Sequence, residues 1–303
     1  MTNEKRIGLE ASYKSMDTEE WLDIHFYRPI GYHLALFFHK LGVTPNTITV
    51  ASIFLGIAAA ICFAYQDWRV NLVGIFFLIW GNSYDSADGQ LARMTNQKSE
   101  LGRILDGVCG DIWFVSIYIA ICVRLTPEWG INIWLLGAAT GFFHSKQAAI
   151  ADYYRNIHLL FLKGKSGSEL AHALPVRELY RSISLRKEPI RKIFHWFYKN
   201  YTANQEQLTP RFQRFYAEVQ EKYGDSIPDS LRSEFRRRSK PLMKYTNILT
   251  FNTRSLVLFI SLLIDEPWIY FAFEITVLNV LFVYMIVCHE KLSFDLTKII
   301  NEP

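Results

Sequence analysis

Apolar residues along this chain are gathered into blocks of about 20, separated by shorter polar connections and by one long polar segment. A helix of about 20 apolar residues spans about 30 Å, the thickness of the hydrocarbon layer of a bilayer. The runs are continuous rather than alternating, which favours helices over a transmembrane β-barrel. The pattern therefore predicts six membrane-spanning helices, at residues 45–65, 70–85, 103–125, 131–151, 248–264 and 267–287. The polar N-terminus and the late first span predict that there is no cleavable signal peptide.

Two regions outside these spans also carry helical patterns. Before the first span, Trp21, Ile24 and Tyr27 recur at the spacing of one helix face, and Pro29 should kink that helix. We expect an amphipathic helix lying in the membrane interface, the alternative being a soluble N-terminal helix. In the polar insert, "RKIFHWFYKNY" and "TPRFQRFYAEVQEKYG" also fit amphipathic helices. These helices could contact lipid headgroups or pack on one another, and their composition favours neither arrangement.

The predicted fold is all-α, a polytopic membrane protein in four parts. The first part is an N-terminal interfacial segment at residues 1–44, and the second contains four membrane helices at 45–155. The third is a basic helical insert at 156–245, and the fourth contains two further membrane helices and a tail at 246–303. All four cysteines fall in or beside apolar spans, which is typical of small core residues and not of a disulfide framework or a zinc site.

The distribution of Lys and Arg predicts the orientation of these helices. The net charge is only +4, but the insert is rich in cations, whereas the connections after the first and third spans contain few. Loops rich in Lys and Arg remain on the cytoplasmic side, so the insert, both termini and residues 94–101 should face the cytoplasm. A local basic excess of this kind fits an anionic membrane surface better than nucleic acid.

Four aspartates lie at the predicted cytoplasmic ends of the second and third spans, in "NSYDSADGQLARMTNQKSELGRILDGVCGDIW". Asp85 and Asp88 are three residues apart and share one helix face, and Asp106 and Asp111 follow on the next helix. Carboxylates at one depth repel one another unless a cation joins them, and all-oxygen ligands select hard ions such as Mg²⁺ or Mn²⁺.

Two such ions can bridge phosphate oxygens, and Arg93 supplies a fixed cation suited to phosphate. The sequence therefore predicts a phosphoryl-transfer site at the edge of the membrane. The alternative interpretation is that these aspartates lie at helix ends and face water.

This stretch resembles the signature of the CDP-alcohol phosphotransferase family, here Asp85-x2-Asp88-Gly89-x2-Ala92-Arg93-x8-Gly102-x3-Asp106. "GVTPNTIT" before the first span is similar to a Thr-Pro-Asn element of that family. The resemblance covers residues 41–151 strongly and the last two spans weakly, and it does not extend to the insert.

The resemblance implies transfer of a substituted phosphate from a CDP-linked donor to an alcohol, with release of CMP. It implies that Asp85, Asp88 and Asp106 hold two divalent ions on the donor diphosphate, and that a fourth aspartate joins them and acts as general base. It further implies a homodimer. We also expect a bacterial inner-membrane protein, with its active site facing the cytoplasm as the distribution of Lys and Arg predicts. The residues assigned to the CDP moiety are Gly89, Ala92, Arg93, Gly102 and Asn46.

The spacing of the last aspartate departs from the family pattern. The family has Asp-x3-Asp, whereas here Gly110 occupies that place and Asp111 follows it. We predict that Asp111 supplies the fourth ligand and the base through a π-bulge between Gly107 and Gly110, since such bulges absorb one inserted residue. The alternative is a regular helix in which Asp111 points away and water or another residue is the base.

Cations in or beside the later spans suggest the acceptor. Lys146, Arg155 and Arg254 are candidates for holding an acceptor phosphate, although the first two could instead reach lipid headgroups. Glu274 is a possible partner of Arg254.

We therefore expect phosphatidyl transfer from CDP-diacylglycerol to a polar alcohol such as inositol phosphate or glycerol phosphate. One alternative is a CDP-choline or CDP-ethanolamine:diacylglycerol phosphotransferase. The alternatives from other classes are a metal transporter and an inactive membrane scaffold.

Overall fold

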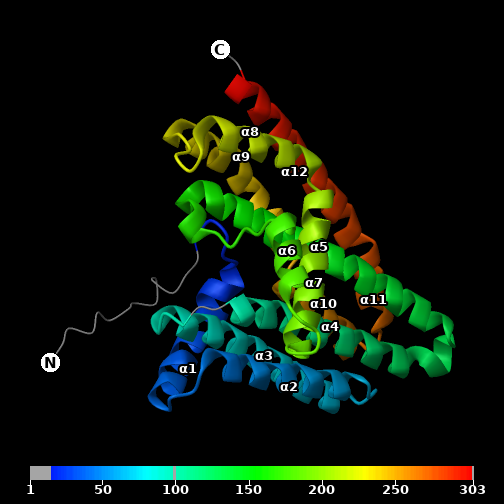
Figure 1. The fold of residues 1–303 in the computed structure, drawn as a ribbon. Helices are drawn as coiled ribbons and strands as arrows, with labels where there is room; N and C mark the ends of the chain where they lie inside the picture. Colours follow the sequence, from blue (N-terminus) through cyan, green and yellow to red (C-terminus); the bar gives the residue numbers. More distant parts are fainter. Residues whose placement is uncertain (1–14, 98–99, 302–303) are drawn as a thin grey trace. The chain divides into compact units, whose positions relative to one another are not determined.

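The computed structural model describes residues 15–97 and 100–301, and every regular element in these ranges is a helix (Figure 1). The prediction of an all-α fold is confirmed for this part of the chain. The chain divides into two compact units, Met1–Phe142 with Ser255–Phe273, and Phe143–Arg254 with Glu274–Pro303. The helices of the first unit are η2 (Asp23–Tyr27), α1 (Arg28–Lys40), α2 (Pro45–Phe63), α3 (Trp68–Met94), α4 (Glu100–Trp129) and parts of α5 (Asn132–Lys163), α10 (Phe251–Leu263) and α11 (Trp268–Ile275).

Four described helical segments are long and apolar enough to cross a membrane, which indicates an integral membrane protein. They are Pro45–Phe63, Ile104–Trp129, Asp229–Leu263 and Trp268–Asn301, and they overlap the first, third, fifth and sixth predicted spans. The second and fourth predicted spans are also helical, within α3 and α5. Polar residues such as Asn82 in α3 and Lys146 in α5 lower the hydropathy of those two helices, so their crossing of the membrane stays a prediction.

The N-terminal segment is helical, and its geometry reflects Pro29. Proline has no N–H, and its ring collides with the carbonyl four residues earlier in a regular helix. Here a π-helical turn, η2, ends at Tyr27, two residues before the proline, and α1 continues from Arg28 to Lys40. The wider turn accommodates the proline without ending the helix. The location of this segment in the membrane interface stays a prediction.

Helices α1, α2 and α3 share an apolar core that brings the start of α2 beside the end of α3. Ala35, Ile48, Ala87 and Leu91 form its buried centre. At the N-terminus of α2, the Thr44 hydroxyl accepts a hydrogen bond from the Thr47 amide, as an N-cap residue does. This packing orients the polar end of α3, which carries the first two aspartates of the motif.

Helix α4 packs against α2 through a tryptophan that sits over a glycine. The Trp113 Nε1–H donates to the Ser52 carbonyl at 3.0 Å, and Ser52 Oγ lies 3.3 Å from Cys109 Sγ. A Cβ on Gly56 would lie only 2.0 Å from a Trp113 ring carbon, so the close approach of these helices requires glycine there. The α2–α4 contact thus fixes the part of α4 that follows Asp106.

We expect Gly56→Ala to destabilise the protein by about 1–3 kcal/mol, because the methyl group overlaps the Trp113 ring and overpacking costs energies of this order. Thermal unfolding in detergent measures the effect. Gly141→Ala is the matched control, since its Cβ would be 3.5 Å from Tyr118, an ordinary contact. Equal unfolding temperatures for the two variants would contradict the close packing of α2 on α4.

The second unit contains the rest of α5 and the insert. Its other elements are η3 (Lys165–Gly167), α6 (Ala173–Ser182), α7 (Pro189–Gln207), α8 (Pro210–Tyr223), α9 (Asp229–Ile248) and α12 (Val277–Asn301). Phe215 from α8 stacks with Phe161 and Phe235, at centroid distances of 5.8 and 6.2 Å. Glu290 of α12 accepts hydrogen bonds from two backbone amides at the N-terminus of α8. Helix α8 therefore packs within the protein through its aromatic face.

Candidate active site and metal site

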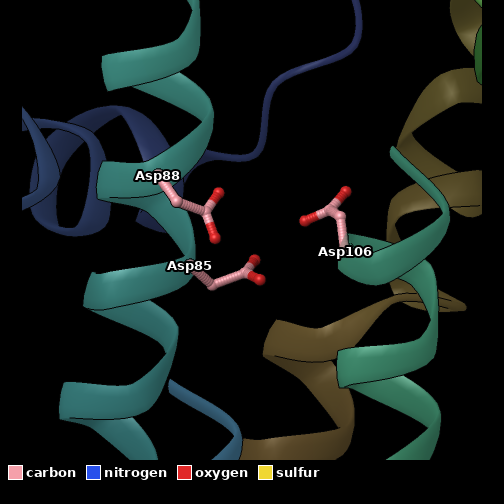
Figure 2. Close-up of side chains that lie close together, drawn as sticks. All are labelled: Asp85, Asp88 and Asp106. Atoms are coloured by element: carbon pink, nitrogen blue, oxygen red, sulfur yellow. The ribbon is translucent and has the colours of Figure 1, made fainter. Parts of the chain in front are cut away.

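Three of the four motif aspartates meet in space. Figure 2 shows Asp85 and Asp88 projecting from one face of α3 toward Asp106 on α4. One carboxylate oxygen from each lies within 4.8 Å of the others. Asp88 is buried, Asp85 is half-buried and Asp106 is exposed. The predicted grouping of these three side chains is therefore present in the structure.

The buried member of the group is held by a residue that the sequence analysis did not select. The Thr49 hydroxyl donates to Asp88 Oδ2 at 2.5 Å and lies 3.2 Å from the Pro45 carbonyl of its own helix. Thr49 is the last residue of "GVTPNTIT", the stretch that is similar to the Thr-Pro-Asn element of the family. From this stretch the sequence predicts only Asn46 as a site residue. The bond fixes the orientation of the Asp88 carboxylate within the cluster.

We expect Thr49→Val to weaken divalent-metal binding by about 10–100-fold, which is the usual effect of removing a group that orients a metal ligand. Calorimetric titration with Mn²⁺ measures it directly. Thr140→Val is the control, because buried Thr140 makes only the same kind of bond to a carbonyl of its own helix, that of Leu136. Unchanged Mn²⁺ affinity in Thr49→Val would exclude a positioning role for this hydroxyl.

The composition of the cluster fits a hard divalent cation. Three carboxylates within such short reach repel one another, and burial of Asp88 strengthens the repulsion because less water screens it. Arg93 and Arg28 lie close enough to act electrostatically on Asp88 and Asp85, respectively. Side-chain oxygens alone suit Mg²⁺ or Mn²⁺ rather than metals that prefer sulfur or nitrogen.

The residues predicted to meet the nucleotide lie beside these aspartates along the helices. Gly89, Ala92 and Arg93 follow Asp88 on α3 and are half-buried. A Cβ on Gly89 would lie 3.3 Å from Arg93 Nη1, so glycine leaves room for the guanidinium to lie along the helix. Gly102 on α4 is half-buried, and Asn46 at the start of α2 is exposed. Contact of these residues with a nucleotide stays a prediction.

The predicted π-bulge is wrong, because α4 is a continuous α-helix through residues 106–115. A π-bulge would break the regular hydrogen-bond pattern of the helix. A Cβ on Gly107 or Gly110 would meet nothing within 4 Å, so packing at these two glycines does not favour a bulge. Five residues along a regular helix turn the side chain by about 140°. Asp111 is accordingly exposed and outside the three-carboxylate group. Its role as fourth ligand and base stays a prediction, and the regular helix favours the alternative.

The predicted acceptor-binding cations lie in the second unit, where each has a polar partner. Arg155 donates to Asn247 Oδ1 from two nitrogens, at 3.1 and 2.7 Å, and Lys146 donates to the Asn204 side chain. The aspartates belong to the first unit, and a role for these cations in acceptor binding stays a prediction.

Arg254 is fully buried and forms an ion pair with Glu274, which confirms the suggested pairing. Gln147 joins them, because its Oε1 accepts from Arg254 at 2.7 Å and its Nε2 donates to the Glu274 carbonyl at 3.2 Å. His144 Nδ1 lies 2.9 Å from Arg254 Nη1. The arginine is thus one member of a buried polar network.

The sequence model of the CDP-alcohol phosphatidyltransferase family matches residues 42–153, the segment that contains all three clustered aspartates. An uncharacterized protein of Aquifex aeolicus is 39% identical over 131 residues, which are 42% of this chain and 65% of that protein. A putative cardiolipin synthase of Mycobacterium tuberculosis is 28% identical over 98 residues, 32% of this chain and 46% of that protein.

An archaetidylinositol phosphate synthase of Pyrococcus horikoshii is 30% identical over 97 residues, 32% of this chain and 50% of that protein. This chain thus spans about half to two thirds of the length of the relatives that it matches. Members of the family are transferases of substituted phosphate groups that take CDP-alcohol donors and alcohol acceptors and use divalent metals. The motif, the grouped carboxylates and these matches agree, and residues 42–153 are similar to the CDP-alcohol phosphatidyltransferase family.

Proposed function

We propose that this protein transfers a phosphatidyl group from CDP-diacylglycerol to a polar alcohol, releasing CMP, as a step of phospholipid synthesis. The observation that carries the proposal is the convergence of Asp85, Asp88 and Asp106 within the segment that matches the family. Two divalent ions held by these carboxylates would supply the positive charge that a diphosphate needs in order to lose CMP.

In the proposed reaction, the acceptor hydroxyl oxygen forms a bond to the phosphorus that carries the diacylglycerol, and the bond from that phosphorus to the CMP oxygen breaks. Thr49 orients Asp88, and Arg93 would lie against the phosphates of the donor. The hydroxyl proton passes to a base. The sequence predicts Asp111 for this role, whereas the regular course of α4 favours water or another residue.

The acceptor is proposed to be a phosphorylated polyol. Two observations support this class. Lys146, Arg155 and Arg254 supply cations in helices α5 and α10, and one of the similar proteins is named an archaetidylinositol phosphate synthase. We further propose a homodimer in a bacterial inner membrane, as the family resemblance implies. The distribution of Lys and Arg supports an orientation with the aspartates facing the cytoplasm.

An acceptor panel tests the proposal. The purified protein, with Mg²⁺ or Mn²⁺, is given CDP-diacylglycerol and inositol phosphate, glycerol phosphate, inositol or serine, and separately diacylglycerol with CDP-ethanolamine. We expect CMP and a new phospholipid only with CDP-diacylglycerol and a phosphorylated polyol, and none after the metal is chelated. Product only from diacylglycerol with CDP-ethanolamine would show that the lipid is the acceptor and that the CDP-linked donor carries the polar headgroup. Metal transport without CMP release would support the transporter, and no turnover with any pair would support the scaffold.

A further inference from the structure

Helix α7 exposes a row of large apolar side chains. Ile190, Ile193 and Phe197 follow the spacing of one helix face, and Trp196 extends that face sideways. Their exposed fractions are 69%, 53%, 51% and 46%, respectively. These four residues are called here the α7 apolar face. On the opposite side of the helix, His195 is buried, so α7 presents its apolar face away from the unit that it belongs to.

The neighbouring helix α8 shows that this arrangement is not a general property of the insert. Phe212, Phe215, Tyr216 and Val219 of α8 are all buried. Both helices alternate aromatic and basic residues, and their sequences alone do not distinguish a lipid-facing helix from a core helix. Large apolar side chains in a contiguous exposed row are uncommon on surfaces that face only water, and they mark a surface for a partner or a membrane.

The charge around the α7 apolar face is positive. Residues 173–207, which contain α6 and α7, carry seven Lys or Arg and three Glu, so this segment alone carries as much net positive charge as the whole chain, which has a net charge of +4. Lys192 and Lys199 lie over the Tyr180 ring of α6, at 3.8 and 4.7 Å from its centroid. Arg186 and Lys187 are exposed just before α7. An apolar face with cations around it is the pattern of a helix that lies on anionic lipid.

Helix α7 is attached to a helix that is itself predicted to enter the membrane. Gln205 donates to the Ala149 carbonyl at 2.9 Å, and the Tyr201 hydroxyl donates to Asp152 at 3.0 Å. Both contacts lie at the end of the predicted fourth span, in α5, and Figure 1 shows α7 running across α5 rather than along it. A helix held across the end of a membrane span lies in the plane of the interface, where an exposed apolar face can enter the bilayer.

We propose that α7 is an interfacial helix that inserts Ile190, Ile193, Trp196 and Phe197 among the acyl chains of an anionic membrane, with the basic residues of α6 and α7 on its headgroups. The second unit would then be fastened to the bilayer surface independently of the transferase chemistry. The proposal does not depend on which donor or acceptor the protein uses.

Spin labelling of the reconstituted protein tests this placement. The four native cysteines are replaced by alanine, and a nitroxide is attached at Ile193→Cys or, as the matched control, at Ala217→Cys on the exposed side of α8. Nanodiscs are prepared from phosphatidylcholine alone or mixed with phosphatidylglycerol. We expect the label at 193 to collide more with dissolved oxygen than with a water-soluble nickel chelate, and the label at 217 to show the reverse.

Two other results at position 193 would overturn the proposal. Equal access of the nickel chelate to both labels would mean that the face lies in water. Exclusion of both collision partners from position 193 would mean that protein covers it, either a second copy of the chain or another partner.

Hydrogen exchange of the unmodified protein gives a second measurement that needs no variant. We expect the amides of α7 to exchange at least about fivefold more slowly in the anionic nanodiscs than in the neutral ones, since each surface cation strengthens attachment by about this factor. Arg186→Gln with Lys187→Gln should remove most of that difference while the exchange of α8 stays unchanged. Identical exchange of α7 in the two lipid compositions would refute the role of anionic lipid.

Discussion

Asp88→Asn will lower the rate of CMP release by about 10³-fold or more. Asparagine keeps the shape of the side chain and can still accept the Thr49 hydrogen bond, so the variant removes one negative charge from the cluster and little else. A divalent ion contributes several kcal/mol to stabilising the developing charge, and each 1.4 kcal/mol is about tenfold in rate. The measurement is CMP release from the CDP-linked donor over a range of Mg²⁺ and Mn²⁺ concentrations, where the residual activity should require more metal.

The matched control for this variant is Asp67→Asn, on the same helix. Asp67 caps the N-terminus of α3 by accepting from the Arg69 amide at 2.8 Å, and asparagine caps helices about equally well. Asp67→Asn should therefore retain full turnover. Full turnover in Asp88→Asn as well would show that the three carboxylates do not form the metal site, and the helix-end interpretation of these aspartates would then hold.

Gly110→Asp will raise turnover by about tenfold or more. Residue 110 is one turn beyond Asp106 and only about 40° away around the helix, so a carboxylate there would share the face that bears Asp106. A Cβ at this position meets no atom within 4 Å, so the side chain fits without displacing a neighbour. A positioned general base contributes about 10²–10⁴-fold. Steady-state CMP release measures the gain, and Gly110→Asn provides the same bulk without the base.

The companion variant Asp111→Asn separates the two interpretations of the fourth aspartate. In the regular α4 helix, Asp111 is exposed and about 140° from Asp106, so we expect its loss to change turnover by less than about threefold. A loss in Asp111→Asn as large as that in Asp88→Asn would restore Asp111 as ligand and base. It would also require α4 to change its helical register when substrates bind.

The prediction of the π-bulge in α4 was wrong because no packing against Gly107 or Gly110 compensates for breaking the regular hydrogen bonds of the helix. The family pattern places a fourth aspartate on the same helix face as Asp106. The prediction therefore required a bulge that would turn Asp111 toward the cluster. Helix α4 is a regular α-helix here, and a Cβ on Gly107 or Gly110 would meet no atom within 4 Å, so no packing contact at these positions opposes a regular turn. The contrast is with residues 23–27, where Pro29 cannot accept a regular turn before it and a π-helical turn is present.

For Arg254, the sequence suggested Glu274 as a partner, and the structure added the other members of the buried polar network. A charged residue inside an apolar run needs a partner, so a buried acid in the next span was the natural candidate. That reasoning could not find Gln147 and His144, because uncharged polar residues in α5 are equally compatible with lipid headgroups or with water. Only the folded structure shows that these two side chains contact Arg254.

The sequence alone determined the helical class, the spans predicted at 45–65 and 103–125, which overlap the helical segments 45–63 and 104–129, and the three aspartates that form the cluster. These features depend on runs of apolar residues and on spacings within one helix, which are properties of neighbouring residues. The tertiary structure alone decided that Thr49 holds Asp88, from 39 positions away in the chain, and that α8 buries its aromatic residues while α7 exposes them. Such facts depend on which helix faces meet, and an amphipathic pattern states that a face is apolar without stating whether protein or lipid will cover it.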